Sequence, residues 1–317
     1  MRITSNPQTI PILLFIFAVF SFFYGFSVDE ISMGAGGYEG DYLFVKKSIA
    51  LFSQNSIFES IKLFSETSNR PPLIYILHKI MNPFFSDETG FRKVVFSISL
   101  LAPLIFYFCL LERFKQVDKY LLLLLASVLF FNPFFRTSSF WGLEENYAII
   151  SSLVSILFLL KLFNDQKKKD PQITFFLILI TLFSSLAIYF DQKFLIIPLI
   201  CFTKIMLSQI LYKFKLTCIF LYTIFSIPYL YLINLWGGIF PTNIYDVGNQ
   251  FYFHHFGYAL SIIAFIFFPF IFLKSKSFLN QLISLFKSQQ NFLLVTLIFI
   301  YLFFLFFFQN DLFLNNR

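Results

Sequence analysis

Charged residues are scarce in this chain, and their shortage is the first guide to its class. Only 13% of the 317 residues are charged, whereas 58% are hydrophobic and 52 are phenylalanine. Apolar runs of roughly 17–20 residues recur along the whole length, and a helix of that length can cross the ~30 Å hydrocarbon core of a bilayer. This composition excludes a soluble domain and predicts a polytopic membrane protein.

Cysteine and glycine are also in short supply, with 3 and 11 residues respectively. Cys109, Cys201 and Cys218 all fall in apolar runs, so we expect small core residues rather than disulfides or metal ligands. The chain has no glycine-rich phosphate loop, no metal-ligand spacing and no internal repeat. The net charge of +7 comes from lysines and arginines scattered through turns, which argues against a nucleic-acid partner.

The apolar runs predict an all-α transmembrane bundle of about nine or ten spans that forms a single domain over residues 1–317. The first span, Pro11–Ser27, precedes a poor signal-peptide cleavage site, so we expect it to be uncleaved. A long polar loop, residues 28–92, follows it. The later expected spans are Lys93–Leu111, Tyr120–Phe135, Glu145–Leu162, Ile173–Phe190, Phe194–Leu211, Leu216–Trp236, Phe256–Leu273 and Phe292–Phe308.

Threading these spans sorts the charges by membrane face. One face, which includes the N-terminus, gathers 14 Lys and Arg against 4 Asp and Glu, and the other gathers 10 against 13. Because basic turns stay in the cytoplasm, the acidic face should be extracytoplasmic, as on the periplasmic side of a bacterial inner membrane. A tenth span at Pro71–Phe85 would invert every later turn and expose Lys167–Lys169, so we expect an interfacial or re-entrant helix there.

The loop at residues 28–92 carries the first group of carboxylates. Asp29, Glu30, Glu39 and Asp41 lie within 13 residues, with a glycine cluster between the two pairs. After Asp41 the apolar spacing predicts an amphipathic helix on the membrane surface, so Asp41 is either an N-cap or a functional acid. Arg70-Pro71-Pro72 then begins a short helix containing Tyr75, and Arg92 precedes the next span.

Two more polar groups occur at expected outer turns. Glu144, Glu145 and Asn146 begin a span close to Arg136, where they could serve as caps and ion-pair partners or as functional groups in a cavity. Asp191-Gln192-Lys193 interrupts an apolar run of some 40 residues. This trio is either a minimal turn or a site where Lys193 holds an anion.

The last outer loop contributes His254 and His255 close to Asp246. Adjacent histidines point in different directions on a helix, and no third ligand is evident, so a zinc site is disfavoured. An interfacial role for these rings is favoured, and His255 remains a candidate substrate contact.

The order of these motifs resembles the polytopic GT-C glycosyltransferases, the fold of protein O-mannosyltransferases and lipid A aminoarabinose transferases. Asp41-Tyr42 through Ala50 is similar to the family's acidic motif with its surface helix, Pro71-Pro72-Leu73-Ile74-Tyr75 to its Pro-Pro-Leu-Tyr-Tyr-like helix, and Phe91-Arg92 to its arginine before the next span. The resemblance covers about residues 11–165. The family usually has adjacent Asp-Glu, whereas this chain has Glu39-Gly40-Asp41 and, upstream, Asp29-Glu30, so two alignments stay open.

The resemblance implies an inverting hexosyl or pentosyl transfer from a polyprenyl-phosphate sugar to a lipid, glycan or protein acceptor. Asp41 would be the catalytic base with Glu39 as runner-up, and Glu144 and Glu145 would be further catalytic candidates. The candidate substrate contacts are Arg70, Tyr75, Arg92, Arg136, Asn146, Lys193 and His255.

No metal is required, because a phosphate leaving group already carries stable charge, but the two acidic groups could hold a divalent cation such as Mg²⁺ or Mn²⁺. The alternative function is a transporter or flippase of a lipid-linked or anionic substrate. Such a protein is expected to carry charged residues near the bilayer midplane.

Overall fold

The computed structural model describes residues 9–31, 37–68, 70–81, 87–164 and 169–238, and all structural statements below concern these residues. The chain divides into two compact units, Met1–Asp246 and Val247–Arg317, and the described residues all belong to the first. The expected spans Phe256–Leu273 and Phe292–Phe308 lie outside the described residues, as do Lys167, Lys168, Asp246, His254 and His255.

Across the described ranges the secondary structure is entirely helical, which confirms the all-α prediction. The elements are α1 (Thr9–Ser27), η1 (Tyr38–Tyr42), α2 (Leu43–Gln54), α3 (Ile57–Thr67), α4 (Leu73–Ile80), α5 (Glu88–Ser99), α6 (Leu101–Arg113), α7 (Lys119–Ser127), η2 (Val128–Phe131), α8 (Pro133–Trp141), α9 (Glu145–Asn164), α10 (Asp170–Phe190), η3 (Gln192–Leu195), α11 (Ile196–Met206) and α12 (Tyr212–Trp236).

Several of these helices can cross a membrane. Five stretches are long and apolar enough: α1, the continuous 26-residue stretch Glu88–Arg113 formed by α5 and α6, α9, α10 and α12. A bent pair, Lys119–Phe131 with Pro133–Trp141, makes a sixth if it is counted as one span. Helices of this length and composition identify an integral membrane protein with several spans.

Two of the expected spans differ from the structure. The stretch Tyr120–Phe135, expected to be one helix, breaks and turns by 61° at Asn132, because Pro133 cannot continue the preceding helix and instead begins α8. The expected span Phe194–Leu211 is a 3₁₀ turn followed by α11, which has only 11 residues. Apolar composition alone indicated neither the bend nor the shortening.

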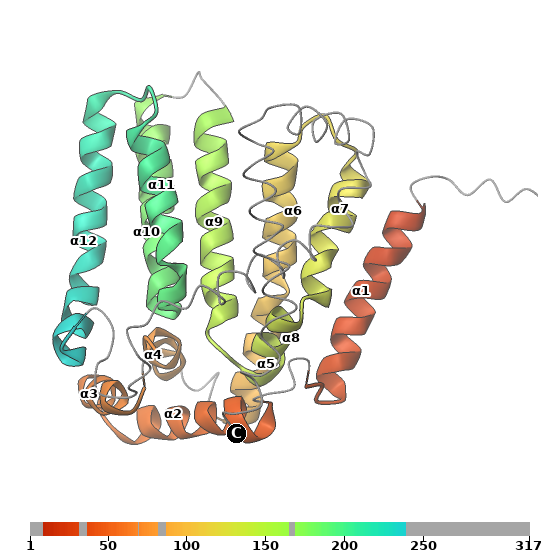
Figure 1. The fold of residues 1–317 in the computed structure, drawn as a ribbon, viewed down its shortest axis with the longest axis vertical. Helices are drawn as coiled ribbons and strands as arrows, with labels where there is room; N and C mark the ends of the chain where they lie inside the picture. Colours follow the sequence, from red (N-terminus) through yellow and green to blue (C-terminus); the bar gives the residue numbers. More distant parts are fainter. Residues whose placement is uncertain (1–8, 32–36, 69, 82–86, 165–168, 239–317) are drawn as a thin grey trace, which may run out of the picture. The chain divides into compact units, whose positions relative to one another are not determined.

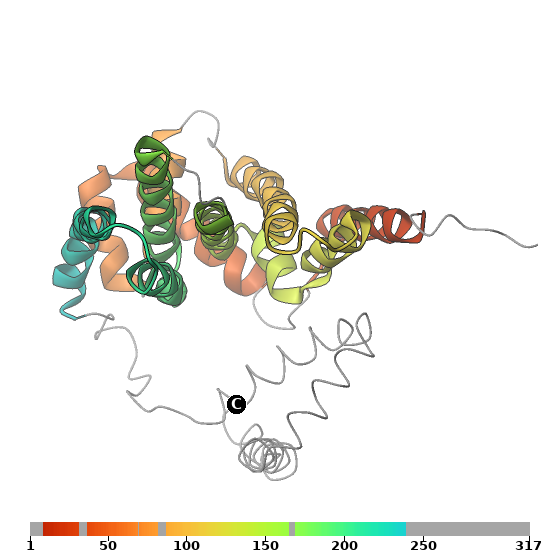
Figure 2. The same cartoon turned by 90° about the horizontal axis from the view of Figure 1, so that it is seen from above.

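The helices run between two ends of the bundle, and short surface helices lie across one of them (Figure 1). We call this the surface end: α1, α8, α10 and α12 finish there, and α5 and α9 begin there. The opposite end carries the starts of α10 and α12, which an ion pair between Asp170 and Lys213 joins. The helices pack side by side in both views, with α10 between α9 and α12 (Figure 2).

The surface helices α2, α3 and α4 fold onto the bundle through one shared core. The buried side chains of α2 and α3, among them Phe52 and Phe64, pack against Tyr75 of α4 and Phe91 of α5. Lys79 of α4 donates to the Phe52 carbonyl and so satisfies a free acceptor at the end of α2. The eight-residue α4 is too short to cross a bilayer, as expected for a surface helix after Pro71-Pro72, whereas α3 was not anticipated.

Candidate functional site

Asp41 lies in a π-helical turn, η1, at the start of the surface helices. Its carboxylate accepts a hydrogen bond from the Gly37 amide at 3.2 Å, and Gly37 adopts a positive φ of 59° that favours glycine. No side chain caps the start of α2, so the N-cap role considered for Asp41 is wrong. The carboxylate instead folds back over its own turn.

The surroundings of Asp41 raise its pKa. Desolvation by burial is the largest cause and the charge of Glu145 adds to it, while the Gly37 hydrogen bond and the charge of Arg70 work in the opposite direction. Both Arg70 and Glu145 are therefore close enough to act on Asp41. Asp41 of the first loop and Glu145 at the start of α9 thus lie near each other at the surface end.

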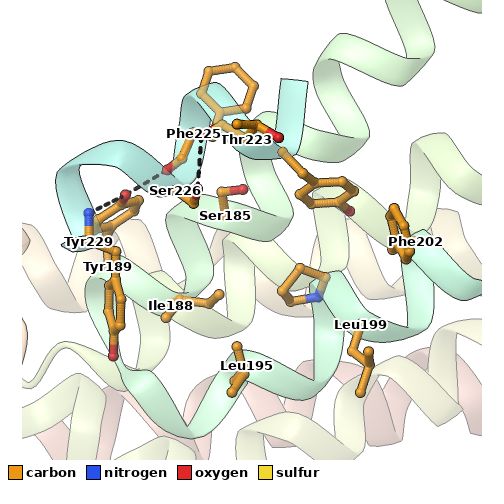
Figure 3. A pocket seen from close by; sticks show the side chains of 12 residues that line it. Ser185, Ile188, Tyr189, Leu195, Leu199, Phe202, Thr223, Phe225, Ser226 and Tyr229 are labelled. Atoms are coloured by element: carbon orange, nitrogen blue, oxygen red, sulfur yellow. Dashed lines mark hydrogen bonds between the residues drawn. The ribbon is translucent and has the colours of Figure 1, made fainter. Parts of the chain in front are cut away.

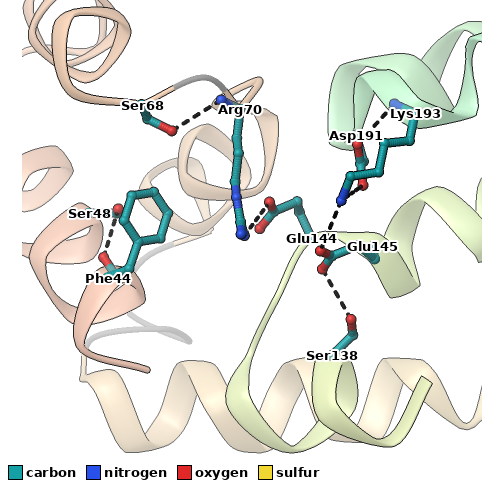
Figure 4. A network of polar contacts seen from close by, with 9 residues as sticks. All are labelled: Phe44, Ser48, Ser68, Arg70, Ser138, Glu144, Glu145, Asp191 and Lys193. Carbon is teal, nitrogen blue, oxygen red and sulfur yellow. Dashed lines mark hydrogen bonds and ion pairs between the residues drawn. The ribbon is translucent and has the colours of Figure 1, made fainter. Parts of the chain in front are cut away.

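Arg70 and Glu144 form the ion pair at the centre of this site, with Nη1 and Oε1 2.8 Å apart (Figure 4). The glutamate side chain is 2% exposed and the arginine side chain 32%. Glu144 sits in the tight connection between α8 and α9, which Gly142 opens by taking the left-handed conformation at the end of α8. The pairing joins the linker before α4 to the start of α9.

Glu144 is only half satisfied by this pair. Its second oxygen, Oε2, is buried without a hydrogen-bond partner. Burial and the neighbouring charge of Glu145 raise the pKa of Glu144, against the opposing effect of Arg70. An unpaired buried carboxylate oxygen is costly, so this atom is suited to accept a hydrogen bond from a ligand.

Glu145 and Asp191 share Lys193 (Figure 4). The Lys193 ammonium lies 3.8 Å from Glu145 Oε1 and 3.3 Å from Asp191 Oδ2, and its side chain is 73% exposed. Ser138 donates to the other oxygen of Glu145 at 3.0 Å. We call Asp41, Arg70, Glu144, Glu145, Asp191 and Lys193 the charged cluster; its four carboxylates outnumber its two cations.

A second network, here called the arginine clamp, contains the other acidic pair of the first loop. Arg136 donates to both carboxylate oxygens of Glu30, through Nε at 2.8 Å and through Nη2. It also donates to the carbonyl oxygens of Phe130 and Ser21, at 2.8 and 3.1 Å. The side chain of Arg136 is therefore almost fully engaged in fixing the end of α1 to α8.

Arg92 joins the clamp from α5. It pairs with Asp29, donates to the Phe140 carbonyl, and stacks over the Trp141 ring with its guanidinium carbon 4.5 Å from the centroid. The order of motifs in the sequence made both Arg92 and Arg136 candidate substrate contacts, and one or the other was expected within reach of Asp41 and of Glu144 or Glu145. The structure gives that place to Arg70 and uses the other two arginines to hold Asp29 and Glu30.

The remaining candidates lie in different surroundings. Asn146 is buried and donates to Ser99, Ser139 and the Phe135 carbonyl, so it joins α9 to α5 and α8. Tyr75 is 1% exposed within the core beneath Glu144. Glu39 is exposed, and His255 lies outside the described residues.

The charged cluster does not suit a divalent cation. Within the described ranges no three His, Cys, Asp or Glu side chains are placed to bind one metal ion together, and Arg70 already occupies one oxygen of Glu144. The arrangement instead combines a half-buried carboxylate, a buried carboxylate with an unpartnered oxygen, and two cations.

Sequence reasoning missed Asp191 as a member of this site. Its side chain is only 7% exposed and its carboxylate also accepts from the Lys193 amide. The available signal was an acidic residue inside a long apolar run, where an ionised carboxylate needs partners.

Comparison with protein-family models, with curated proteins and with solved structures gives no match.

Proposed function

We propose that this protein is a membrane glycosyltransferase that moves a sugar from a polyprenyl-phosphate donor to an acceptor hydroxyl at the surface end. The observation that supports this best is the convergence of Asp41, Arg70 and Glu145 from three separate parts of the chain. The order of motifs in residues 11–165, which resembles the GT-C enzymes, supports it independently.

In the proposed reaction Asp41 is the general base. Its carboxylate takes the proton of the acceptor hydroxyl while the acceptor oxygen bonds to the anomeric carbon of the sugar. The bond from that carbon to the phosphate oxygen breaks, and its electron pair leaves with the polyprenyl phosphate. Partial burial suits Asp41 to this task, because raising the pKa of a carboxylate makes it a stronger base near neutral pH.

Lys193 and Arg70 would stabilise the phosphate that leaves. Lys193 projects from the turn between α10 and α11 and is largely exposed, so its ammonium can turn toward a phosphate. The Arg70 side chain stays 32% exposed while it pairs with Glu144, and an arginine can contact a phosphate through more than one N–H group. The free Oε2 of Glu144 would accept a hydrogen bond from a sugar hydroxyl.

The position of the charges favours this function over transport. A transporter usually carries charged residues near the bilayer midplane in broken helices. Here the charged cluster gathers at the ends of α9 and α10 and on the surface helices, which suits chemistry at the membrane face.

We further propose that the surface end faces away from the cytoplasm, on the periplasmic side of a bacterial inner membrane. The support is the charge asymmetry of the sequence: the face carrying the charged cluster holds the excess of acids, and the opposite turns hold the excess of lysine and arginine.

The test is a transfer assay with purified protein in lipid nanodiscs and a radiolabelled polyprenyl-phosphate sugar. Wild-type protein should release polyprenyl phosphate and label an acceptor, and Asp41→Asn should lower the rate by about 10²–10⁴. Glu39→Gln is the matched control, because it lies two residues away and is exposed. If Asp41→Asn keeps full activity while Glu39→Gln loses it, Asp41 is not the base.

A further inference from the structure

Helix α12 carries a proline at position 228 within its 25 residues. Proline has no amide hydrogen, so the Ile224 carbonyl loses its usual partner four residues on. The axis of α12 changes direction toward its C-terminal end in both views (Figures 1 and 2). Such a break in the hydrogen-bond ladder is a recognised cause of helix bending.

A tyrosine hydroxyl from the neighbouring helix enters this break. Tyr189 of α10 donates to the Phe225 carbonyl at 2.6 Å and accepts from the Tyr229 amide at 2.9 Å (Figure 3). In an unbroken helix those two backbone groups would bond to each other. The hydroxyl therefore bridges the ladder of α12 on the side of the proline that leads to the surface end.

The two halves of α12 belong to different cores. The first half contributes Phe214 and Cys218 to a core with α9, α10 and α11. The second half contributes Leu232 and Trp236 to the core beneath the surface helices. The break at Pro228 thus falls between two independently anchored segments.

Space for movement lies beside the break. A cavity of about 530 Å³ opens between α10, α11 and α12, and its lining includes Tyr189 of α10 together with Phe225, Ser226 and Tyr229 of α12, which flank Pro228 in sequence (Figure 3). Close packing would prevent a hinge here, whereas an open cavity lets the backbone shift without a clash.

We infer that Tyr189 and Pro228 form a latched hinge in α12. With the Tyr189 hydroxyl in the ladder, the segment Tyr229–Trp236 is held against the surface helices. When the hydroxyl leaves, this segment swings about Pro228 while the first half stays in its own core. If the proposed function holds, the motion opens the charged cluster from the side of the membrane, because Leu232 and Trp236 share a core with Tyr75 and Leu143 beside Arg70 and Glu144.

The test measures distances between pairs of spin labels, which attach only to introduced cysteines because Cys109, Cys201 and Cys218 are buried. A reference label replaces Leu104 of α6, and its partner replaces Leu230 beyond the hinge or Phe220 before it; all three side chains are exposed. Tyr189→Phe removes two hydrogen bonds, so the swung-out population should rise roughly 5- to 30-fold. The distribution of distances between labels at positions 104 and 230 (the 104–230 distribution) should then broaden. The corresponding distribution for positions 104 and 220 (the 104–220 distribution) should not.

Two further variants make the result decisive. Tyr222→Phe is the matched control, because the Tyr222 hydroxyl also joins α12 to α10, through Ser184 at 2.9 Å, but does not enter the ladder. It should leave both distributions unchanged. Adding Pro228→Ala to Tyr189→Phe restores the amide hydrogen that can bond to the Ile224 carbonyl. The 104–230 distribution should therefore narrow again.

An unchanged 104–230 distribution in Tyr189→Phe would overturn the hinge, and so would equal broadening of both pairs or an equal effect of Tyr222→Phe. No catalytic assay enters this test, so its failure would leave the proposed transferase untouched, and the reverse also holds.

Discussion

At the scale of single residues, the chain uses its carboxylates in two ways. Asp29 and Glu30 form ion pairs with arginines that are themselves packed against aromatic rings. These two carboxylates therefore have a structural role. Burial instead raises the pKa of Asp41 and of Glu144 above the ordinary values for Asp and Glu. This difference separates Asp29 and Glu30 from Asp41, although in the sequence either segment could be aligned with the acidic motif.

The acid limb of the pH–rate profile should report on Asp41. A base must be deprotonated, so the rate should fall as pH drops through a pKa higher than the ordinary value for Asp. Arg70→Gln removes a cation that lowers this pKa, and the acid limb should therefore move to higher pH. The measurement is kcat/KM against pH for the transfer reaction.

Lys193→Gln is the matched control for that experiment. It also removes a cation of the charged cluster, but Lys193 is not among the groups that shift the pKa of Asp41. The rate should fall without a displacement of the acid limb. Identical displacement in both variants would contradict the assignment of the limb to Asp41.

At the scale of helices, patterns within one element were predictable and pairings between elements were not. The start of α9 at Glu145 and the short α4 after Pro71-Pro72 follow from local caps and apolar spacing. The Arg136–Glu30 pair joins residues 106 apart in sequence, and Arg70–Glu144 joins residues 74 apart. Such partners depend on how helices pack, which no local pattern encodes.

Gly25 of α1 should be intolerant of a side chain. A Cβ there would collide with the Arg136 guanidinium, the Glu30 carboxylate and the Phe140 ring. Gly25→Ala should therefore lower stability by about 1–3 kcal/mol, since overpacking outweighs the gain in helix propensity. Thermal unfolding in detergent measures the change.

Gly40→Ala serves as the comparison, because a Cβ at that position meets nothing within 4 Å. Its unfolding midpoint should match that of the wild type. Equal unfolding midpoints for Gly25→Ala and Gly40→Ala would show that the absence of a side chain at Gly25 is not needed for the close approach of α1 to the arginine clamp.

At the scale of the whole molecule, the helices order the charges so that one end of the described bundle carries the charged cluster. Apolar run lengths were enough to predict an all-α membrane protein with several spans. They could not show that one span bends by 61° or that α11 is short, because both depend on how local breaks are accommodated by neighbouring helices.

Membrane sidedness can be tested by labelling introduced cysteines in intact cells. Glu59→Cys, exposed on α3 at the surface end, should react with an impermeant maleimide. Lys115→Cys, exposed between α6 and α7, should react only after permeabilisation. The opposite pattern would place the charged cluster on the cytoplasmic side and contradict the proposal that the surface end faces away from the cytoplasm.

The most direct test of the account compares Asp41→Asn with Glu30→Gln in parallel assays of sugar transfer and thermal unfolding. Asp41→Asn should lose transfer and keep its unfolding midpoint, because Asp41 is the base of the proposed reaction and carries no structural ion pair of the arginine clamp. Glu30→Gln should lose about 1–3 kcal/mol of stability, because it weakens the bonds to Arg136, and should retain transfer at temperatures where it is folded. The reverse pattern, with transfer lost in a folded Glu30→Gln and kept in Asp41→Asn, would contradict the division of the carboxylates into a chemical and a structural network.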